Sequence, residues 1–187
     1  NQHEKGENSM DISGSKGIFV GGASGMCRAT AIKFAEKGGK VAILDQEQSN
    51  GAEVAKELGG TFHVCNVMDF DGIESVFAGA VEALGGVHYV VNTAGGGVAK
   101  RTLARDGSKH PLDDFRRIID LNLIGSFNVN RIAAEHMAKN EPNDAGERGV
   151  MINTASIAAF EGQIGQVAYT AAKGGIAAMT LTMARDL

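Results

Sequence analysis

Short apolar runs alternate with longer helix-forming segments along the whole chain. Five runs rich in Val, Ile or Phe are expected to be strands, at residues 17–21, 40–45, 61–66, 87–92 and 149–154. Five segments have the length and composition of helices, at residues 26–37, 50–58, 71–84, 112–139 and 166–185. Because helices of this length carry the chain back between parallel strands, the alternation predicts an α/β fold. We expect a doubly wound parallel sheet with helices on both faces, a three-layer αβα arrangement.

The size and composition of the chain are those of one globular domain. Its 187 residues are 43% hydrophobic, which is enough to bury one core. We assign residues 10–187 to this single domain. Residues 1–9 are polar, and we interpret them as a disordered extension or a cloning remnant.

Charge and residue distribution argue against several classes of partner. The net charge of −4 disfavours nucleic acid and anionic membranes. Neither the two cysteines, Cys27 and Cys65, nor the five scattered histidines have the spacing of metal ligands, so no metal site is expected. No apolar run is long enough to span a membrane. We therefore expect a small-molecule partner, no membrane or nucleic acid, and the cytoplasm as the compartment.

A glycine-rich loop follows the first expected strand and leads directly into a helix. Its sequence, Gly-Gly-Ala-Ser-Gly-Met-Cys, occupies residues 21–27. Glycines at such a turn let a pyrophosphate approach backbone N–H groups at the helix N-terminus, where the helix dipole favours negative charge. An ordinary glycine turn between a strand and a helix would have the same composition.

Asp45 favours the cofactor-binding interpretation of this loop. It ends the second expected strand, about 20 residues beyond the loop, where a carboxylate can accept hydrogen bonds from both ribose hydroxyls of an adenosine and repels a 2′-phosphate. Because Ser24, which precedes Gly25, carries no positive charge to offset this repulsion, we expect NAD and not NADP. The loop and the acid together predict a Rossmann-type fold.

Three polar side chains form the candidate catalytic group. Tyr169 and Lys173 lie four residues apart in an expected helix, so both fall on one face. A nearby ammonium stabilises a phenolate, which makes Tyr169 a candidate general acid and base. Ser156 follows the fifth expected strand, where its hydroxyl can hydrogen-bond the substrate oxygen. A solvated helix carries such a pair by chance, and a serine also caps helices, but the three together favour catalysis.

These motifs resemble, in order and spacing, those of the short-chain dehydrogenase/reductase family. The resemblance extends over residues 10–187 and includes the glycine loop, Asn92-Thr93-Ala94-Gly95, Asn122, Ser156 and the pair Tyr169 and Lys173. The segment 149–163 and the loops around 101–112 and 140–142 further resemble the family's type 2 3-hydroxyacyl-CoA dehydrogenases.

The resemblance implies reversible hydride transfer between NAD and C3 of a 3-hydroxyacyl-CoA. The catalytic residues that it implies are Ser156, Tyr169, Lys173 and Asn122. The cofactor-binding residues that it implies are Gly21, Ser24, Gly25, Met26, Asp45, Asn66, Val67, Asn92, Ala94, Gly95, Tyr169 and Lys173. Asn122 would support a proton relay, although a helical asparagine also bonds to a neighbouring carbonyl without any catalytic role. The resemblance also implies a homotetramer, or at least a homodimer, and mitochondria as an alternative compartment.

Other functions stay open at this point. The substrate can be an acyl-CoA or a similar alcohol or ketone, as in hydroxysteroid dehydrogenases and 3-oxoacyl carrier protein reductases of the family. Another hypothesis is a catalytically degenerate member that acts as a binding or scaffold protein. Four cationic residues of the loop 95–111 are candidates for contacts with CoA phosphates, although solvated loop charges have the same pattern: Lys100, Arg101, Arg105 and Lys109.

The chain departs from the family pattern at several positions. Val20 and Cys27 replace a threonine and a third glycine of the loop, and Asn66 replaces an aspartate beside the adenine. We expect the Cys27 side chain either to shift the helix or to intrude towards the pyrophosphate, and so to reduce NAD affinity. The family continues beyond residue 187 with two more strands and a helix. If residue 187 is the terminus, we expect a sheet that lacks the C-terminal strands and has an exposed edge. The alternative is a longer chain whose remainder becomes ordered when a cofactor or partner binds.

Overall fold

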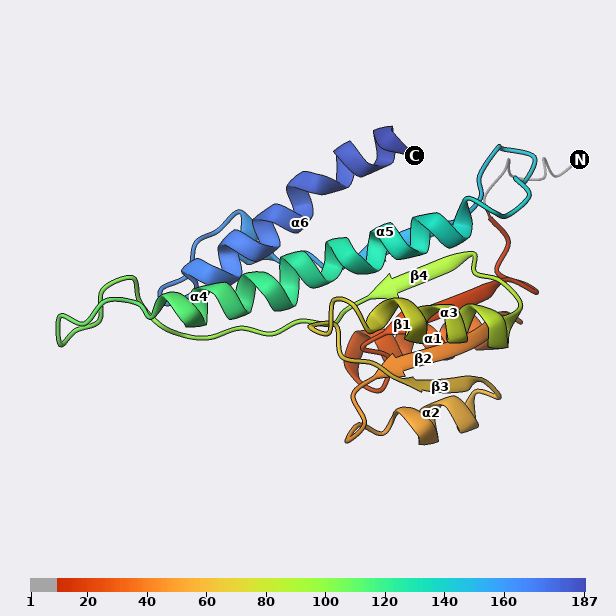
Figure 1. Cartoon of the computed structure of the whole chain (residues 1–187), viewed down its shortest axis with the longest axis horizontal. Helices are drawn as coiled ribbons and strands as arrows, with labels where there is room; N and C mark the ends of the chain where they lie inside the picture. Colours follow the sequence, from red (N-terminus) through yellow and green to blue (C-terminus); the bar gives the residue numbers. More distant parts are fainter. Residues whose placement is uncertain (1–9) are drawn as a thin grey trace, which may run out of the picture.

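A computed structural model describes residues 10–187 of the chain, which contain one five-stranded parallel sheet (Figure 1). The strands are β1 (Lys16–Val20), β2 (Lys40–Asp45), β3 (Thr61–Val64), β4 (Tyr89–Asn92) and β5 (Val150–Asn153). Their order is β3-β2-β1-β4-β5, and every neighbouring pair is parallel. The predicted α/β fold is therefore confirmed. The prediction for residues 1–9, a disordered extension or a cloning remnant, lies outside the described residues.

Helices cover both faces of the sheet. They are α1 (Gly25–Glu36), α2 (Gly51–Glu57), α3 (Ile73–Leu84), α4 (Leu112–Ile119), α5 (Gly125–Met137) and α6 (Val167–Asp186), with a short 3-10 turn, η2 (Ile157–Ala159). The segment 112–139, expected to be a single helix, consists of α4 and α5 joined by a π-helical turn, η1 (Asp120–Ile124). Figure 1 shows these three elements as one continuous rod with α6 beside it.

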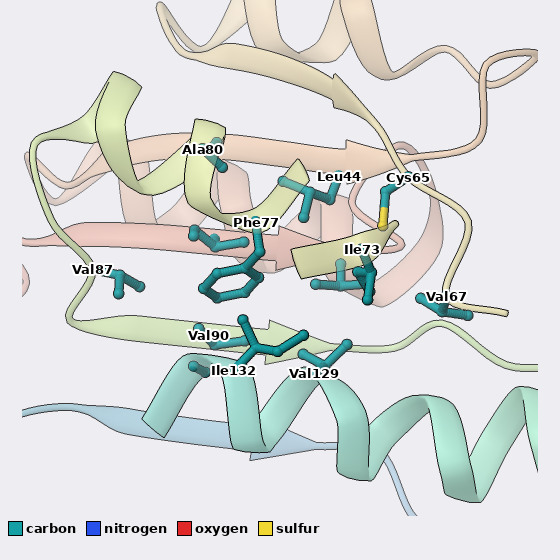
Figure 2. Close-up of a cluster of buried hydrophobic side chains, with 14 of the residues drawn as sticks. Leu44, Cys65, Val67, Ile73, Phe77, Ala80, Val87, Val90, Val129 and Ile132 are labelled. Carbon is teal, nitrogen blue, oxygen red and sulfur yellow. The ribbon is translucent and has the colours of Figure 1, made fainter. Parts of the chain in front are cut away.

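Two apolar clusters on opposite faces of the sheet form most of the core. Because neighbouring residues of a strand point to opposite faces, Ile18 and Val20 of β1 belong to one cluster, and Phe19 belongs to the other. The first cluster packs against α3 and α5, where Figure 2 shows Phe77 of α3 beside Ile132 of α5. The second packs against α1 and α2. Burial of these large side chains is the main contribution that stabilises the central strands.

The β5 edge of the sheet is buried less than its centre. Residues 17–20 of β1 are all buried, whereas Ile152 of β5 is 47% exposed. Within residues 10–187, β5 has β4 as its single hydrogen-bonded neighbour.

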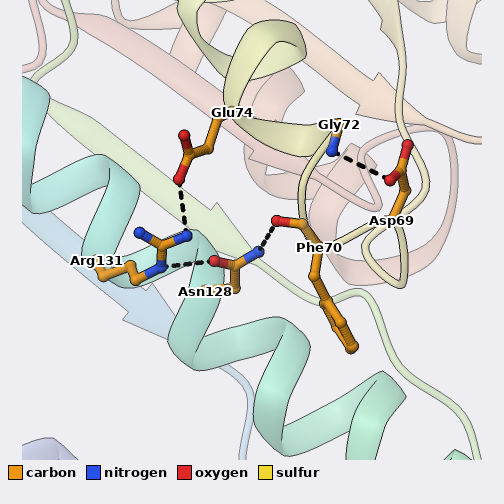
Figure 3. Close-up of polar contacts among 6 residues, drawn as sticks. All are labelled: Asp69, Phe70, Gly72, Glu74, Asn128 and Arg131. Atoms are coloured by element: carbon orange, nitrogen blue, oxygen red, sulfur yellow. Dashed lines mark hydrogen bonds and ion pairs between the residues drawn. The ribbon is translucent and has the colours of Figure 1, made fainter.

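Polar contacts also tie α5 to the segment before α3 (Figure 3). Asn128 Nδ2 donates to Phe70 O at 3.0 Å, and Arg131 Nε donates to Asn128 Oδ1 at 2.7 Å. Arg131 also forms an ion pair with Glu74 at 2.7 Å, but both side chains are exposed, so the pair adds little stability. These contacts orient α5 relative to the loop that follows β3.

Two kinds of feature are absent from residues 10–187. No helix there combines the length and the apolar character that crossing a bilayer requires. No group of three or more His, Cys, Asp and Glu side chains there is arranged to hold a metal ion.

Candidate active site

The glycine loop joins β1 to α1 at the carboxyl end of the sheet. Gly21 has a φ of 81°, a left-handed conformation that glycine adopts without strain. A Cβ at Gly21 would lie 2.9 Å from Thr93 Oγ1 and 3.1 Å from Ala94 N, both in the loop after β4. Glycine at this position therefore allows the loops after β1 and β4 to approach closely.

A cleft of about 450 Å³ opens between these two loops, where the strand order of the sheet reverses. The predicted cofactor-binding residues that line it are Gly21, Ser24, Gly25, Met26, Asp45, Val67, Ala94 and Gly95. Sequence reasoning missed further lining residues, among them Gln46, Cys65, Thr93 and Leu121. All four directly adjoin predicted site residues, which are Asp45, Asn66, Asn92 and Asn122 in the same order. Adjacency was therefore an available signal for each of them.

Two asparagines predicted to bind the cofactor do not line the cleft. Asn66 is exposed, and its Oδ1 accepts a hydrogen bond from Met68 N at 3.1 Å. Asn92 is 3% exposed; its Nδ2 donates to Ser126 Oγ at 3.1 Å, and its Oδ1 accepts from Ala94 N at 3.1 Å. Asn92 thus supports the loop that forms one wall of the cleft, and Asn66 shapes the turn after β3.

The Asp45 carboxylate lies at the end of β2 beside the glycine loop. Its Oδ2 accepts from Ala23 N at 2.9 Å, and its Oδ1 accepts from Gln46 N at 2.8 Å. None of the four ion pairs found among residues 10–187 involves Asp45. The Asp45 carboxylate thus lies at one end of the cleft, and within residues 10–187 no cationic side chain forms an ion pair with it.

Cys27 does not intrude into the cleft. Its side chain is fully buried between α1 and the sheet, with Sγ 3.5 Å from Val20 O and 3.7 Å from Val91 O. The expectation that the thiol intrudes towards the pyrophosphate is therefore wrong, because the side chain points down into the core and packs against Phe19 and other apolar residues. Burial raises the pKa of Cys27 to about 11, so the group stays a protonated thiol at neutral pH.

Tyr169 and Lys173 lie one turn apart near the start of α6. The Lys173 side chain is 4% exposed, and its Nζ lies 5.6 Å from the centre of the Tyr169 ring. Nζ donates a hydrogen bond of 2.7 Å to Thr154 O, directly after β5. Burial lowers the pKa of Lys173, because removal from water disfavours the ammonium form. The structure thus brings the predicted pair together and holds the ammonium against a backbone carbonyl.

Ser156 follows β5 and begins η2, which packs against α6. Its Oγ accepts a hydrogen bond from Ala158 N at 3.2 Å, so the serine does cap a short helix, as the alternative interpretation expected. This bond leaves the hydroxyl hydrogen free to be donated. The cap therefore orients the side chain without excluding a contact with a substrate oxygen.

Asn122 lies in the π-helical turn η1 and is completely buried. Its Nδ2 donates to Ile118 O at 2.9 Å, which is the helical carbonyl contact that the alternative interpretation expected. Its amide also contacts Gly96 twice: Nδ2 donates to Gly96 O at 2.7 Å, and Oδ1 accepts from Gly96 N at 3.1 Å. A Cβ at Gly95 would lie 2.5 Å from Asn122 Oδ1. The π turn, a feature common at functional sites, thus fixes the loop after β4.

The basic loop 95–111 contains an irregular hairpin that extends beyond the start of α4, away from the sheet (Figure 1). Leu103 and Lys109 form an antiparallel bridge, and His110 N donates to Thr102 O at 2.9 Å. Lys100 forms an ion pair with Asp114, which partly neutralises its charge. A second cleft of about 460 Å³ lies between this hairpin and residues 162–167. Of the four cations predicted as phosphate contacts, Lys100 and Arg101 line this cleft, and Arg105 and Lys109 do not.

Comparisons with known proteins agree with this geometry. The family model described as short chain dehydrogenase matches residues 17–187. Human 3-hydroxyacyl-CoA dehydrogenase type-2 is 45% identical over 179 residues, which cover 94% of this chain and 69% of the human protein. The Drosophila melanogaster enzyme of the same name is 44% identical over 173 residues, covering 91% of this chain and 68% of that protein.

Solved structures show the same fold. The crystal structure of 3-hydroxyacyl-CoA dehydrogenase type-2 from Mycobacterium avium aligns with a TM-score of 0.89 and 41% identity, covering 96% of this chain and 72% of that one. NAD+-bound xylitol dehydrogenase aligns with a TM-score of 0.81 and 27% identity, covering 95% of this chain and 66% of that one.

Proposed function

The chain belongs to the short-chain dehydrogenase family of oxidoreductases, and from this premise we propose that it interconverts a 3-hydroxyacyl-CoA and a 3-oxoacyl-CoA with NAD. The observation that carries the proposal is the position of Lys173, whose Nζ lies 5.6 Å from the centre of the Tyr169 ring and donates to Thr154 O, two residues before Ser156. The choice of substrate is supported by the similarity to enzymes named 3-hydroxyacyl-CoA dehydrogenase type-2.

The proposed cofactor site is the cleft between the loops after β1 and β4, and the Asp45 carboxylate supports NAD over NADP. Gly21 leaves space that a Cβ would fill, so that a pyrophosphate could approach the loop before α1. Asp45 would accept hydrogen bonds from the ribose hydroxyls, and its unneutralised charge would repel a 2′-phosphate. Ser24, Gly25, Met26, Val67, Ala94 and Gly95 would form the walls. We retain Asn66 and Asn92 as indirect supports of these walls.

Tyr169 would act as the general base in alcohol oxidation. NAD held in the cleft would supply the acceptor for the hydride from C3. As the carbonyl forms, the substrate hydroxyl proton passes to the Tyr169 phenolate, and in the reverse reaction Tyr169 returns it. Ser156 Oγ would donate a hydrogen bond to the reacting oxygen. The Lys173 ammonium, held by Thr154 O, would stabilise the phenolate, and Asn122 would keep the loop after β4 in place for a proton relay.

The hairpin supports a proposed contact with the CoA part of the substrate. Arg101 lines the cleft beneath the hairpin and is a candidate contact for CoA phosphates.

Apolar side chains that reach solvent on a long helix support the proposal of a homotetramer, or at least a homodimer. Ile124 and Phe127 are 41% and 49% exposed. Light scattering that gives a monomer mass at high concentration would contradict the oligomer.

The reaction can be tested by following NADH absorbance with 3-hydroxybutyryl-CoA as substrate. We expect turnover by the unmodified chain and a loss on the order of 10²–10⁴ in kcat for Tyr169→Phe, the range that general acid and base catalysis supplies. Calorimetry should show that this variant still binds NAD. Turnover that survives Tyr169→Phe would refute the assigned role. Binding of NAD without turnover of any acyl-CoA would refute the assigned substrate.

A further inference from the structure

A row of buried polar residues runs along one side of the rod formed by η1 and α5. Asn122, Ser126 and Asn130 are spaced by four residues and are 0%, 3% and 2% exposed. Residues at this spacing lie on the same side of a helix. Each bonds to a different part of the carboxyl end of the sheet: Asn122 to Gly96, Ser126 to Asn92, and Asn130 to Asn153. The three residues therefore attach the loop after β4, the end of β4 and the end of β5 to one continuous helix.

The contact between Asn130 and Asn153 is reciprocal. Asn130 Nδ2 donates to Asn153 Oδ1 at 3.1 Å, and Asn153 Nδ2 donates to Asn130 Oδ1 at 3.3 Å. A buried amide without partners costs free energy, so each side chain favours the position that satisfies the other. Two hydrogen bonds between planar amides also fix orientation, which apolar contact does not.

The strand that receives this contact ends at Asn153. Asn153 is the last residue of β5 and lies opposite Asn92 in the sheet register. The hydrogen bonds from Asn130 therefore act at the point where the strand passes into the segment that leads to Ser156. Because these bonds are directional, they fix the orientation of the Asn153 side chain as well as its position.

The carboxyl end of β5 leads directly to the catalytic group. Thr154 follows Asn153; its Oγ1 donates to Asn92 O at 3.1 Å, and its carbonyl accepts from Lys173 Nζ at 2.7 Å. Ser156 follows two residues later. A displacement at Asn153 would thus move the carbonyl that holds Lys173 and the serine that would contact the substrate.

We propose that Asn130 is a positioning residue, which acts through Asn153 to hold Thr154 and Ser156 in their places for the reaction. This inference rests on the proposed function, and it adds a residue that touches neither substrate nor cofactor. Neither Asn130 nor Asn153 lines the cofactor cleft, and Lys173 is the predicted cofactor-binding residue that the contact reaches, through Thr154 O. Asn130 should therefore affect turnover more than it affects NAD affinity.

A local test that needs no turnover is hydrogen exchange of the peptide that contains residues 150–156. Asn130→Leu removes the amide but keeps a branched side chain of similar shape and a good helix former. The matched control is Asn128→Leu, the same exchange at another buried asparagine of α5, one that bonds to Phe70 O. We expect faster exchange in residues 150–156 for Asn130→Leu alone. Equal exchange in both variants would overturn the proposal that Asn130 holds the end of β5 in place.

The second test separates positioning from a structural role. For Asn130→Leu we expect kcat to fall on the order of tenfold, because small misplacements of catalytic groups are costly, with the NAD dissociation constant within about twofold. The pH profile of kcat should shift, since the carbonyl that holds Lys173 moves. If the variant only contained less folded protein, the apparent kcat would fall by the same factor at every pH, and the pH profile would not shift. An unchanged kcat and pH profile per folded molecule would overturn the proposal.

A double variant adds a check on the route through Asn153. If Asn130 acts through that residue, Asn130→Leu/Asn153→Leu should lose no more activity than the worse single variant, so the two effects would not add. Fully additive losses would contradict the coupling. Absence of turnover in the unmodified chain would refute the proposed function. The exchange experiment would still decide whether Asn130 restrains residues 150–156.

Discussion

The two halves of the site are built by different forces. The cofactor half, at the ends of β1 and β2, rests on fully buried strands and on a glycine that leaves no room for a side chain. The catalytic half, after β5, is held by hydrogen bonds from Asn130, Lys173 and Thr154. Burial is strong but non-directional, whereas hydrogen bonds contribute less and fix orientation. Stability should therefore depend mainly on the first half, and catalytic geometry mainly on the second.

The largest effect expected from this comparison is on turnover. Lys173→Met should lower kcat by on the order of 10²–10⁴, because it removes the charge beside Tyr169. Its melting temperature should change little, since replacing a desolvated ammonium by an apolar side chain is often neutral. Lys33→Met, at an exposed position of α1, is the matched control and should keep full activity. A kcat within threefold of the parent would contradict the role of Lys173.

The reverse pattern is expected in the cofactor half. Phe19→Ala should lower the free energy of unfolding by about 3–5 kcal/mol, because it leaves a cavity between the sheet and α1. Urea denaturation measures this change. Phe160→Ala, at a residue that is 79% exposed, should change it by less than about 0.5 kcal/mol. If both variants lost similar amounts of the free energy of unfolding, burial of the side chain would not explain the stability of the central strands.

The smallest effect concerns Cys27, where the sequence predicted weaker NAD binding. Because the thiol points away from the cleft, Cys27→Gly should leave the NAD dissociation constant within about threefold, the equivalent of less than 1 kcal/mol. It should destabilise the fold by about 1 kcal/mol, through the added helical glycine and the lost packing. Cys27→Ala should cost less. A tenfold tighter NAD complex in Cys27→Gly would restore the original prediction.

The order of strands and helices could be predicted from the sequence because apolar periodicity reports burial directly. Each expected strand is present, with ends that differ by up to two residues. The pairing of Tyr169 with Lys173 could also be predicted, because four residues span one turn of any helix. The position of Asp45 beside the glycine loop followed from parallel strands whose carboxyl ends share one edge.

Other features depended on contacts between distant segments. The π turn at Asp120–Ile124 and the direction of the Cys27 side chain had no signal in local composition. The link between Asn130 and Asn153 joins residues 23 positions apart, one on α5 and one on β5.

The sequence by itself thus determined the fold class, the glycine loop and the set of candidate catalytic residues, since each depends on local spacing. Only the tertiary structure decided which buried polar groups meet. A side-chain amide or thiol has several possible partners of equal chemistry, and its choice is made when the packed helices and strands exclude all but one.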